Sequence, residues 1–165
     1  YTPTHVRKLG GGRADRYAKF LIEEVKPFVE REYRVLPGSL HAGIGGSSLG
    51  GLVSLYLGLK HSAIFGKIAA LSPSVWWNQL FIHRFVKALR VERRPRIWLD
   101  IGTREGARMV EDVERFRDLL LQGGWRLEQG LHYERVEGAE HNEIAWAQRV
   151  RPFLEFLYPA SPGAV

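Results

Sequence analysis

A serine flanked by glycines is the residue in this sequence best suited to chemistry. Residues 46–50 read Gly-Ser-Ser-Leu-Gly, which fits the G-x-S-x-G pattern of a nucleophile elbow, a sharp turn that lifts a serine hydroxyl above the end of a β-sheet. The reactive oxygen is then that of Ser48, which could attack an ester carbonyl. Because a chain with 18 glycines can produce this pattern by chance, the interpretation depends on the neighbouring residues.

Those neighbours predict the strand and the helix that an elbow joins. Residues 40–45 form a short apolar run typical of a buried strand, and residues 49–59 are apolar on almost every face, as in a helix packed under other elements. The positions two before and two after a strained serine approach each other, so side chains there would clash. Gly46 and Gly50 occupy these two positions.

Two nucleotide-binding interpretations of the same glycines fail. A phosphate-binding P-loop needs Lys-Ser or Lys-Thr after its second glycine, whereas Gly50 is followed by Gly51 and Leu52. A dinucleotide fingerprint needs a third glycine where this chain has Ser48. The glycines therefore favour a nucleophilic serine.

A serine nucleophile needs a base, and His141 is the candidate. It alone among the six histidines lies on a loop directly after a predicted strand, at the edge of the sheet where Ser48 is expected. The other five occupy positions more typical of structural or solvated histidines. They are His5, His41, His61, His83 and His132.

The acid that orients the base has two candidates. Glu105 follows the predicted strand 96–101 on a loop, and the order Ser48, Glu105, His141 matches the Ser…Asp/Glu…His order of α/β-hydrolases. Asp100 lies inside that strand, where its side chain is expected to point toward a helix-covered face. Glu105 is therefore favoured, and Asp100 remains the alternative.

The oxyanion of an ester reaction would be stabilised by backbone N–H groups. The amide of Leu49, directly after the nucleophile and at a helix N-terminus, is one such donor. The second donor normally comes from a loop after an earlier strand, and the sequence identifies no counterpart.

The elements that must position these residues alternate along the chain. A helix with Asp15 as its N-cap runs to about residue 33 and is kinked at Pro27, and further helices are predicted over residues 49–59, 81–89, 109–121 and 143–158, the last tolerating Pro152. The predicted strands cover residues 40–45, 66–71, 96–101 and 131–136. This alternation predicts a parallel α/β sheet with helices on both faces, whose ligands bind beyond the carboxyl ends of the strands.

Composition excludes several other classes of function. The 165 residues suit one domain, and the net charge of +6 is spread over segments that mix both signs, such as 31–34, so no nucleic-acid partner is expected. No apolar run is long enough to span a membrane, so no membrane partner is expected either. The absence of cysteine excludes disulfides and thiolate ligands.

No metal or other cofactor is expected. The spacing of His141 and Glu143 is like that of zinc deaminases, but those enzymes need cysteine ligands, and the H-E-x-x-H spacing of zinc peptidases is absent.

Five motifs together resemble the putative-esterase family, the esterase D or enterochelin-esterase-like branch of the α/β-hydrolases. The resemblance covers nearly the whole chain and implies that Ser48, Glu105 and His141 match the nucleophile, acid and base of that family. The motifs are residues 46–52 (GSSLGGL), 64–67 (IFGK), 71–77 (LSPSVWW), 100–106 (DIGTREG) and 140–143 (EHNE).

Three further residues are candidates for substrate binding. Trp76 and Trp77 are expected at the mouth of the site, where their rings could line an acyl or sugar pocket, although core packing explains one of the two equally well. Arg104 could meet an anionic substrate group, but an ordinary surface charge is the better interpretation.

The chain departs from the family pattern in one respect. Family members have additional strands before the region matched here, so we expect residues 1–165 to form a single α/β-hydrolase domain that is the C-terminal portion of a longer esterase domain. The exposed sheet edge that results could be covered by a homodimer or by pairing with a missing N-terminal segment.

Two functions therefore remain open. The first is a serine carboxylic-ester hydrolase that acts through an acyl-enzyme on a small-molecule or carbohydrate-linked ester. The alternative is a non-catalytic α/β binding or assembly module that retains Ser48, Glu105 and His141 but lacks a complete oxyanion hole.

Overall fold

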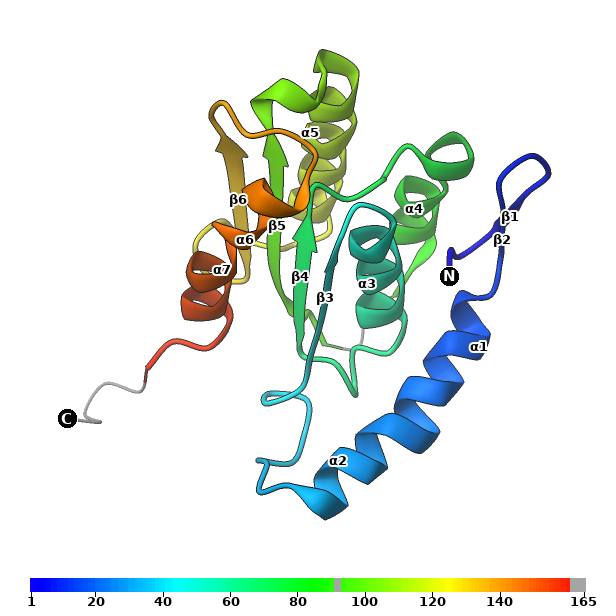
Figure 1. Cartoon of the computed structure of the whole chain (residues 1–165), viewed down its shortest axis with the longest axis vertical. Coiled ribbons are helices and arrows are strands. Elements are labelled where there is room, and N and C mark those ends of the chain that lie inside the picture. Colours follow the sequence, from blue (N-terminus) through cyan, green and yellow to red (C-terminus); the bar gives the residue numbers. More distant parts are fainter. Residues whose placement is uncertain (91–92, 161–165) are drawn as a thin grey trace.

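Four parallel strands form the sheet at the centre of the chain (Figure 1). The computed structural model describes residues 1–90 and 93–160. The strands β3 (Gly43–Ser47), β4 (Lys67–Leu71), β5 (Arg96–Gly102) and β6 (Leu131–Val136) lie side by side in sequence order, and each pair is parallel. The predicted parallel sheet is confirmed. Its carboxyl ends lie along one edge, since Ser47 pairs with Leu71 and Leu71 with Asp100.

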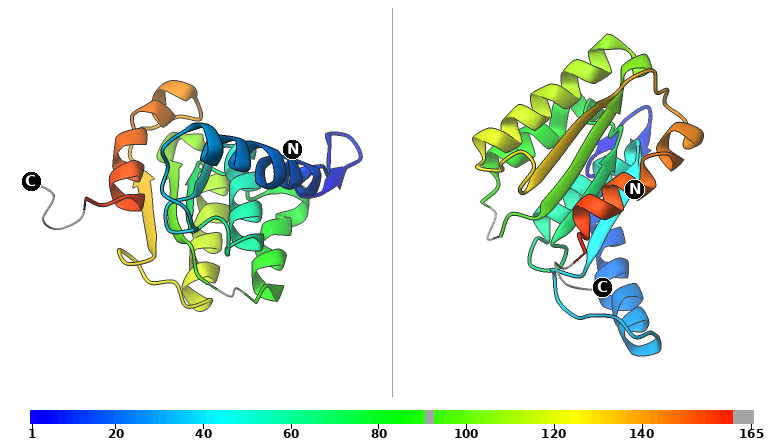
Figure 2. Two further views of the ribbon diagram at one scale, coloured as in Figure 1. Left: turned by 90° about the horizontal axis from the view of Figure 1, so that it is seen from below. Right: turned by 90° about the vertical axis from the view of Figure 1, so that its left-hand side faces the viewer.

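Helices cover both faces of this sheet (Figure 2). The connecting helices α3 (Leu49–Lys60), α4 (Trp77–Ala88) and α5 (Ala107–Gln122) join strands that are neighbours in the sheet, and right-handed crossovers place all three on one face. The helices α6 (Glu143–Ala147) and α7 (Val150–Leu157) follow β6 and cover the opposite face.

The strands alternate between two apolar layers. Side chains such as Ile68 and Leu99, both fully buried, pack toward α3 and α5, whereas their neighbours Ala69 and Trp98 pack with Leu157 of α7. Burial on both faces explains why the central strands are apolar at nearly every position.

The first helical segment differs from its predicted form. It is preceded by a short antiparallel pair, β1 (His5–Val6) and β2 (Gly10–Gly11), and runs through α1 (Ala14–Lys19), the π-helical η1 (Phe20–Val25) and α2 (Lys26–Glu32). Asp15 is not the N-cap, because it lies inside α1 and accepts hydrogen bonds from Tyr56 and Lys60. Pro27 stands in the first turn of α2, where its missing N–H is tolerated, and the wider π-helical turns precede it.

The last predicted helix is in fact two helices. Helix α6 ends at Ala147 and α7 begins at Val150, so the chain turns at Gln148 and Arg149. The reason is Pro152, which cannot donate to the carbonyl of Gln148 and whose ring would clash with it in a continuous helix. The break directs Arg149 inward, where it is 3% exposed.

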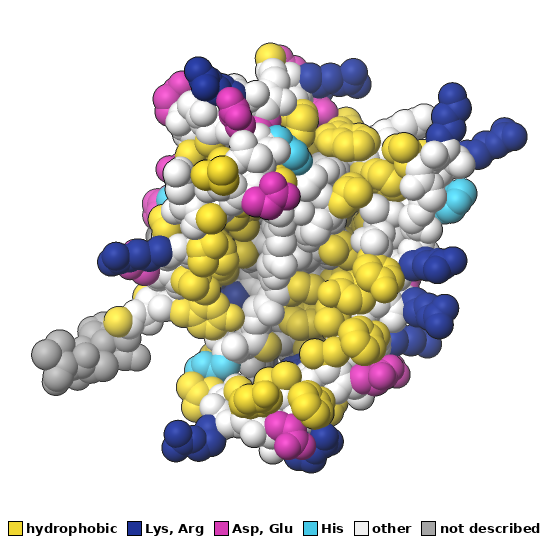
Figure 3. Space-filling model, viewed as in Figure 1, with side chains coloured by type: hydrophobic (Ala, Val, Ile, Leu, Met, Phe, Trp, Pro, Cys, Tyr) yellow, Lys and Arg dark blue, Asp and Glu magenta, His cyan; other side chains and the backbone are white. Residues whose placement is uncertain are grey.

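The strand that leads to Ser48 lies at the edge of the sheet and is not buried as predicted. It begins at Gly43 rather than at Leu40, which is exposed, and within the described ranges it pairs with β4 alone. Apolar side chains of the α1–α2 segment, among them Leu21, Val25 and Val29, share a groove with β3, and Figure 3 shows hydrophobic side chains gathered on this face. Coverage of this edge by a second copy or by a further segment stays a prediction.

No helix in the described part of the chain is long and apolar enough to cross a membrane.

Candidate active site

The backbone at Ser48 has the geometry of a nucleophile elbow. Ser48 lies between β3 and α3 with φ 55° and ψ −122°, a conformation that costs a non-glycine residue about 1–3 kcal/mol. A Cβ on Gly46 would lie 2.8 Å from the carbonyl carbon of Gly50, so Gly46 must be glycine. The prediction that a side chain at position 50 would clash is wrong, because a Cβ added to Gly50 meets nothing within 4 Å. Gly51 is the second tight position in the elbow, because a Cβ added there would lie 3.0 Å from the Cβ of Pro73.

Three predicted residues from three strand ends lie within hydrogen-bond distance of one another. The Oγ of Ser48 is 2.9 Å from Nε2 of His141, and Nδ1 of His141 is 2.6 Å from Oε2 of Glu105. His141 comes from the loop between β6 and α6, and Glu105 ends the short 3-10 helix η2 (Thr103–Glu105) that follows β5. The side chain of Glu105 is 0% exposed and that of His141 is 33% exposed. The array of Ser48, His141 and Glu105 is therefore buried at the acid and partly exposed at the histidine.

The hydrogen bonds of this array define the tautomer of His141. An ionised carboxylate only accepts hydrogen bonds, so the Nδ1 facing Glu105 carries the proton. Nε2 of the neutral ring then has a free lone pair, which accepts from the Ser48 hydroxyl. This is the arrangement in which a histidine can remove a proton from serine.

Asp100, the alternative acid, is engaged elsewhere. It is fully buried in β5, pairs with the guanidinium of Arg149, and accepts from Nε1 of Trp98 at 2.7 Å and from the backbone N–H of Ser72 at 3.0 Å. Burial raises the pKa of the Asp100 carboxyl, while Arg149 and these N–H donors oppose the rise. The structure thus brings Glu105, and not Asp100, into contact with His141.

The predicted oxyanion donor, the amide of Leu49, lies directly after the serine in the chain. Leu49 is the first residue of α3, so its amide has no acceptor within the helix and lies at the positive end of the helix dipole. The hydroxyl of Ser74 also lies close to the serine, with its Oγ 3.3 Å from that of Ser48. Ser74 belongs to the motif of residues 71–77, but its closeness to Ser48 was not predicted.

The two tryptophans behave differently from each other. Trp77 is 3% exposed and donates its indole N–H to the carbonyl and hydroxyl of Thr4, so it is a core residue and not a pocket wall. Trp76 is 40% exposed and lines a shallow hollow that includes Ala107 and Arg108 at the start of α5. Of the two, only Trp76 is exposed, and the hollow that it lines contains none of Ser48, Glu105 and His141.

Arg104 is an exposed side chain beside the array. Its guanidinium lies 3.6 Å from Glu140, which is also exposed, and its backbone N–H donates to Ala139. These contacts favour the interpretation as a surface charge.

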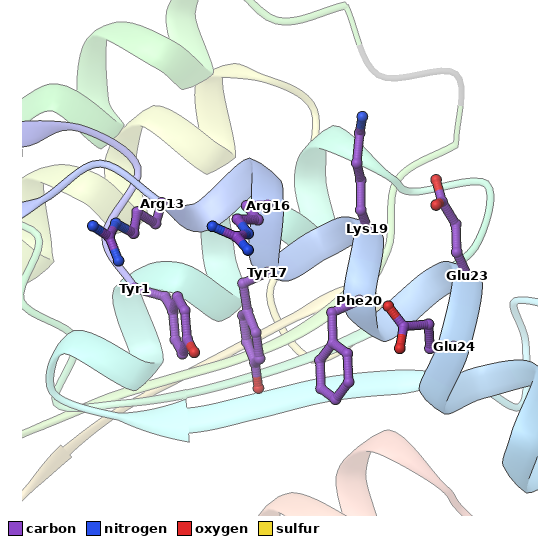
Figure 4. A pocket seen from close by; sticks show the side chains of 8 residues that line it. All are labelled: Tyr1, Arg13, Arg16, Tyr17, Lys19, Phe20, Glu23 and Glu24. Atoms are coloured by element: carbon purple, nitrogen blue, oxygen red, sulfur yellow. The ribbon is translucent and has the colours of Figure 1, made fainter.

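A separate hollow along α1 does not belong to this site (Figure 4). Tyr1 and Tyr17 stack there with ring centroids 4.4 Å apart, among basic and acidic side chains that include Arg13, Arg16 and Glu24. None of the residues that line it belongs to the array. Its mixed charges give no indication of a single ligand class.

The described ranges offer no cluster of metal ligands. No group of three or more His, Cys, Asp or Glu side chains there is arranged to hold a metal ion.

Comparison with known proteins places the chain in a family. The family model described as "Putative esterase" matches residues 3–156. The chain belongs to this family. Ferri-bacillibactin esterase BesA of Bacillus subtilis is 30% identical over 158 residues, covering 92% of this chain and 54% of BesA. The uncharacterized protein YbbA of the same organism is 26% identical over 171 residues, which cover 96% of this chain and 68% of YbbA.

Solved structures of similar proteins share the fold. The BES protein from Bacillus cereus superimposes with a TM-score of 0.76 at 22% identity, over 94% of this chain and 63% of that protein. The enterobactin esterase of Shigella flexneri gives a TM-score of 0.74 at 22% identity, over 87% of this chain and 37% of its own. The chain thus has the α/β-hydrolase-type fold but spans only part of the length of these relatives.

Proposed function

We propose that this chain is a serine carboxylic-ester hydrolase in which Ser48 is the nucleophile, His141 the general base and Glu105 the orienting acid. The observation that carries the proposal is the unbroken pair of hydrogen bonds from Ser48 through His141 to the buried Glu105. Membership of the esterase family supports the same reaction class.

In the proposed reaction, the proton of the Ser48 hydroxyl moves to His141 and then to the leaving group, and it is not passed on to Glu105. The Oγ of Ser48 attacks the ester carbonyl while Nε2 of His141 takes the hydroxyl proton. His141 then gives that proton to the leaving alkoxide, and an acyl-enzyme remains on Ser48. Water attacks the acyl group in a second round of the same steps. Glu105 stabilises the imidazolium that forms in both rounds.

The negative oxygen of each tetrahedral intermediate would be held by the amide of Leu49. A free amide at the start of a twelve-residue helix combines a hydrogen-bond donor with the helix dipole. Removing one oxyanion donor typically costs about a hundredfold or more in rate, so a site with only one donor would be slow.

The substrate is proposed to be a small-molecule or carbohydrate-linked ester. Three curated relatives are named for siderophore esters, among them the siderophore enterobactin esterase of Emericella nidulans, which is 33% identical over 109 residues. The exposed ring of Trp76 offers an apolar face for an acyl group.

Labelling with a serine-directed phosphonate tests this proposal. The reagent should modify Ser48, and peptide mapping distinguishes it from its neighbours Ser47 and Ser74. Turnover of p-nitrophenyl acetate should disappear in Ser48→Ala and persist in Ser62→Ala, a control at a buried serine outside the array.

Two results would contradict the proposal that the chain is a serine ester hydrolase. Adducts on serines other than Ser48 would refute its assignment as the nucleophile. A folded chain with neither adduct nor turnover would instead favour the alternative, a binding or assembly module that keeps the array without a working oxyanion hole.

A further inference from the structure

The hydroxyl of Ser72 lies at the centre of a buried network behind Glu105. Ser72 follows β4, is 0% exposed, and has a φ of 43°. Its Oγ is 2.5 Å from Oε1 of Glu105, 3.1 Å from Nε1 of Trp146 and 3.2 Å from Nη1 of Arg149. It thus connects the candidate acid to two residues of the C-terminal helices.

The chemistry of these partners determines which way the Ser72 hydroxyl points. A hydroxyl has one proton and two acceptor lone pairs. The indole of Trp146 and the guanidinium of Arg149 can only donate, so they occupy both lone pairs. The single proton of Ser72 must then be donated to Glu105.

This donation leaves Glu105 one orientation. Its Oε1 accepts from Ser72 and from the backbone N–H of Gly102 at 2.8 Å, so only Oε2 faces His141. A carboxylate held by donors at both oxygens cannot rotate without breaking a buried, charge-assisted hydrogen bond.

The two donors to Ser72 are themselves fixed by the fold. Arg149 stands at the break between α6 and α7, donates from Nε to the carbonyl of Ala145, and pairs with Asp100. The rings of Trp146 and His141 form a T-shaped pair, with centroids 4.9 Å apart and planes at 86°. One turn of chain therefore touches His141 directly and Glu105 through Ser72.

We propose that Ser72 is a positioning residue: its hydroxyl, oriented by Trp146 and Arg149, holds the carboxylate of Glu105 in line with His141. This inference rests on the proposed function, in which Glu105 orients the base. It assigns to Asp100 the separate role of holding Arg149 in place.

Kinetics of two Ser72 variants form the first test. Ser72→Ala and Ser72→Gly both remove the hydroxyl, but glycine suits the positive φ and should give the more stable protein. Both should lower kcat by about tenfold to a hundredfold with KM nearly unchanged, because the base is misplaced and the pocket is not. Ser62→Ala, which removes a buried hydroxyl outside the network, should match the wild type. Retention of kcat in Ser72→Gly would show a merely structural role and overturn the proposal.

Removing the hydrogen bond that Trp146 donates to Ser72 should have an intermediate effect on kcat. Trp146→Phe keeps an aromatic ring against His141 but frees one lone pair of Ser72, so its hydroxyl can turn away from Glu105. We expect a fall in kcat smaller than that of Ser72→Ala. A larger fall would contradict the proposed role of the hydroxyl.

Proton NMR separates this inference from the proposed function, because it requires no turnover. The Nδ1 proton of His141, in a hydrogen bond of 2.6 Å, should give a downfield resonance that His141→Gln removes. The resonance should persist in Ser48→Ala and shift or broaden in both Ser72 variants. An unchanged resonance in the Ser72 variants would overturn the inference even in an active enzyme. Its shift or broadening in a chain without turnover would uphold the inference and refute the hydrolase.

Discussion

Gly46 and Gly50 meet through their backbones alone, because a Cβ on Gly46 would lie 2.8 Å from the carbonyl carbon of Gly50. Gly46→Ala should therefore destabilise the elbow by about 1–3 kcal/mol, the usual cost of overpacking, and should reduce ester turnover by displacing Ser48. Urea unfolding and p-nitrophenyl acetate hydrolysis measure the two effects.

Gly50→Ala is the matched control. An added Cβ there meets open space within α3, so the free energy of unfolding should rise by about 0.5–1 kcal/mol. A Gly46→Ala variant as stable as the wild type would contradict the close approach.

The assignment of the acid is tested by comparing Glu105→Ala with Asp100→Ala. Loss of Glu105 should lower kcat by about 10³–10⁴-fold, because Nδ1 of His141 loses its acceptor. It also leaves the buried hydroxyl of Ser72 and the N–H of Gly102 without an acceptor, which should cost about 1–3 kcal/mol of unfolding free energy. Loss of Asp100 leaves Arg149 buried and unpaired, which should cost about 3–5 kcal/mol of unfolding free energy. Steady-state kinetics at matched folded fractions compare the kcat of the two variants. A loss of kcat in Glu105→Ala no greater than that in Asp100→Ala would contradict the assignment of Glu105 as the acid.

Much of the sheet was predictable because it depends on local signals. The strand over residues 131–136 was predicted with the bounds of β6, and the break at Gly123 and Gly124 limits α5 as expected for a C-terminal stop. The order of Ser48, Glu105 and His141 along successive strands was enough to bring them to one edge, because the carboxyl ends of parallel strands coincide.

The contacts behind the site could not be predicted, since they depend on long-range packing. In the sequence, Arg149 is one more charged residue of a predicted helix, and only the break imposed by Pro152 turns it toward Asp100. Ser72 reads as the end of a strand, and its link to Glu105 spans 33 positions. Likewise, the burial that separates Trp77 from Trp76 depends on Thr4, more than seventy positions away.

The burial of His83, outside the site, predicts that the folded chain loses stability at acid pH. His83 is 6% exposed; its Nε2–H donates to the carbonyl of Asp112 at 3.1 Å, and its Nδ1 has no partner in the described part of the chain. Burial lowers the pKa of His83, and the nearby cations of Lys87 and Arg115 act in the same direction, while Asp112 opposes them.

The imidazole of His83 therefore binds a proton more tightly in the unfolded chain than in the folded one. The stability contributed by neutral His83 is present above the unfolded value of about 6.5 and is lost as the pH falls below it. Urea unfolding between about pH 7.5 and about pH 5.5 should show a smaller decline in His83→Gln than in the wild type. The exposed His5 supplies the control, because His5→Gln should decline as the wild type does. Equal declines in all three proteins would contradict the role of His83.

The cap of α6 links helix stability to the position of the base. The Oδ1 of Asn142 accepts from the backbone N–H of Ala145 at 2.9 Å, and Asn142 directly follows His141. Asn142→Ala removes this cap and should cost about 0.5–2 kcal/mol, whereas Asn142→Asp retains an accepting oxygen and adds a favourable charge at the helix N-terminus. Because the same turn of chain carries His141 and Trp146, fraying of α6 should also reduce kcat in the alanine variant alone. Thermal unfolding and steady-state kinetics of both variants measure these effects, and an equal loss of kcat in the aspartate variant would attribute the effect to the amide itself rather than to the cap.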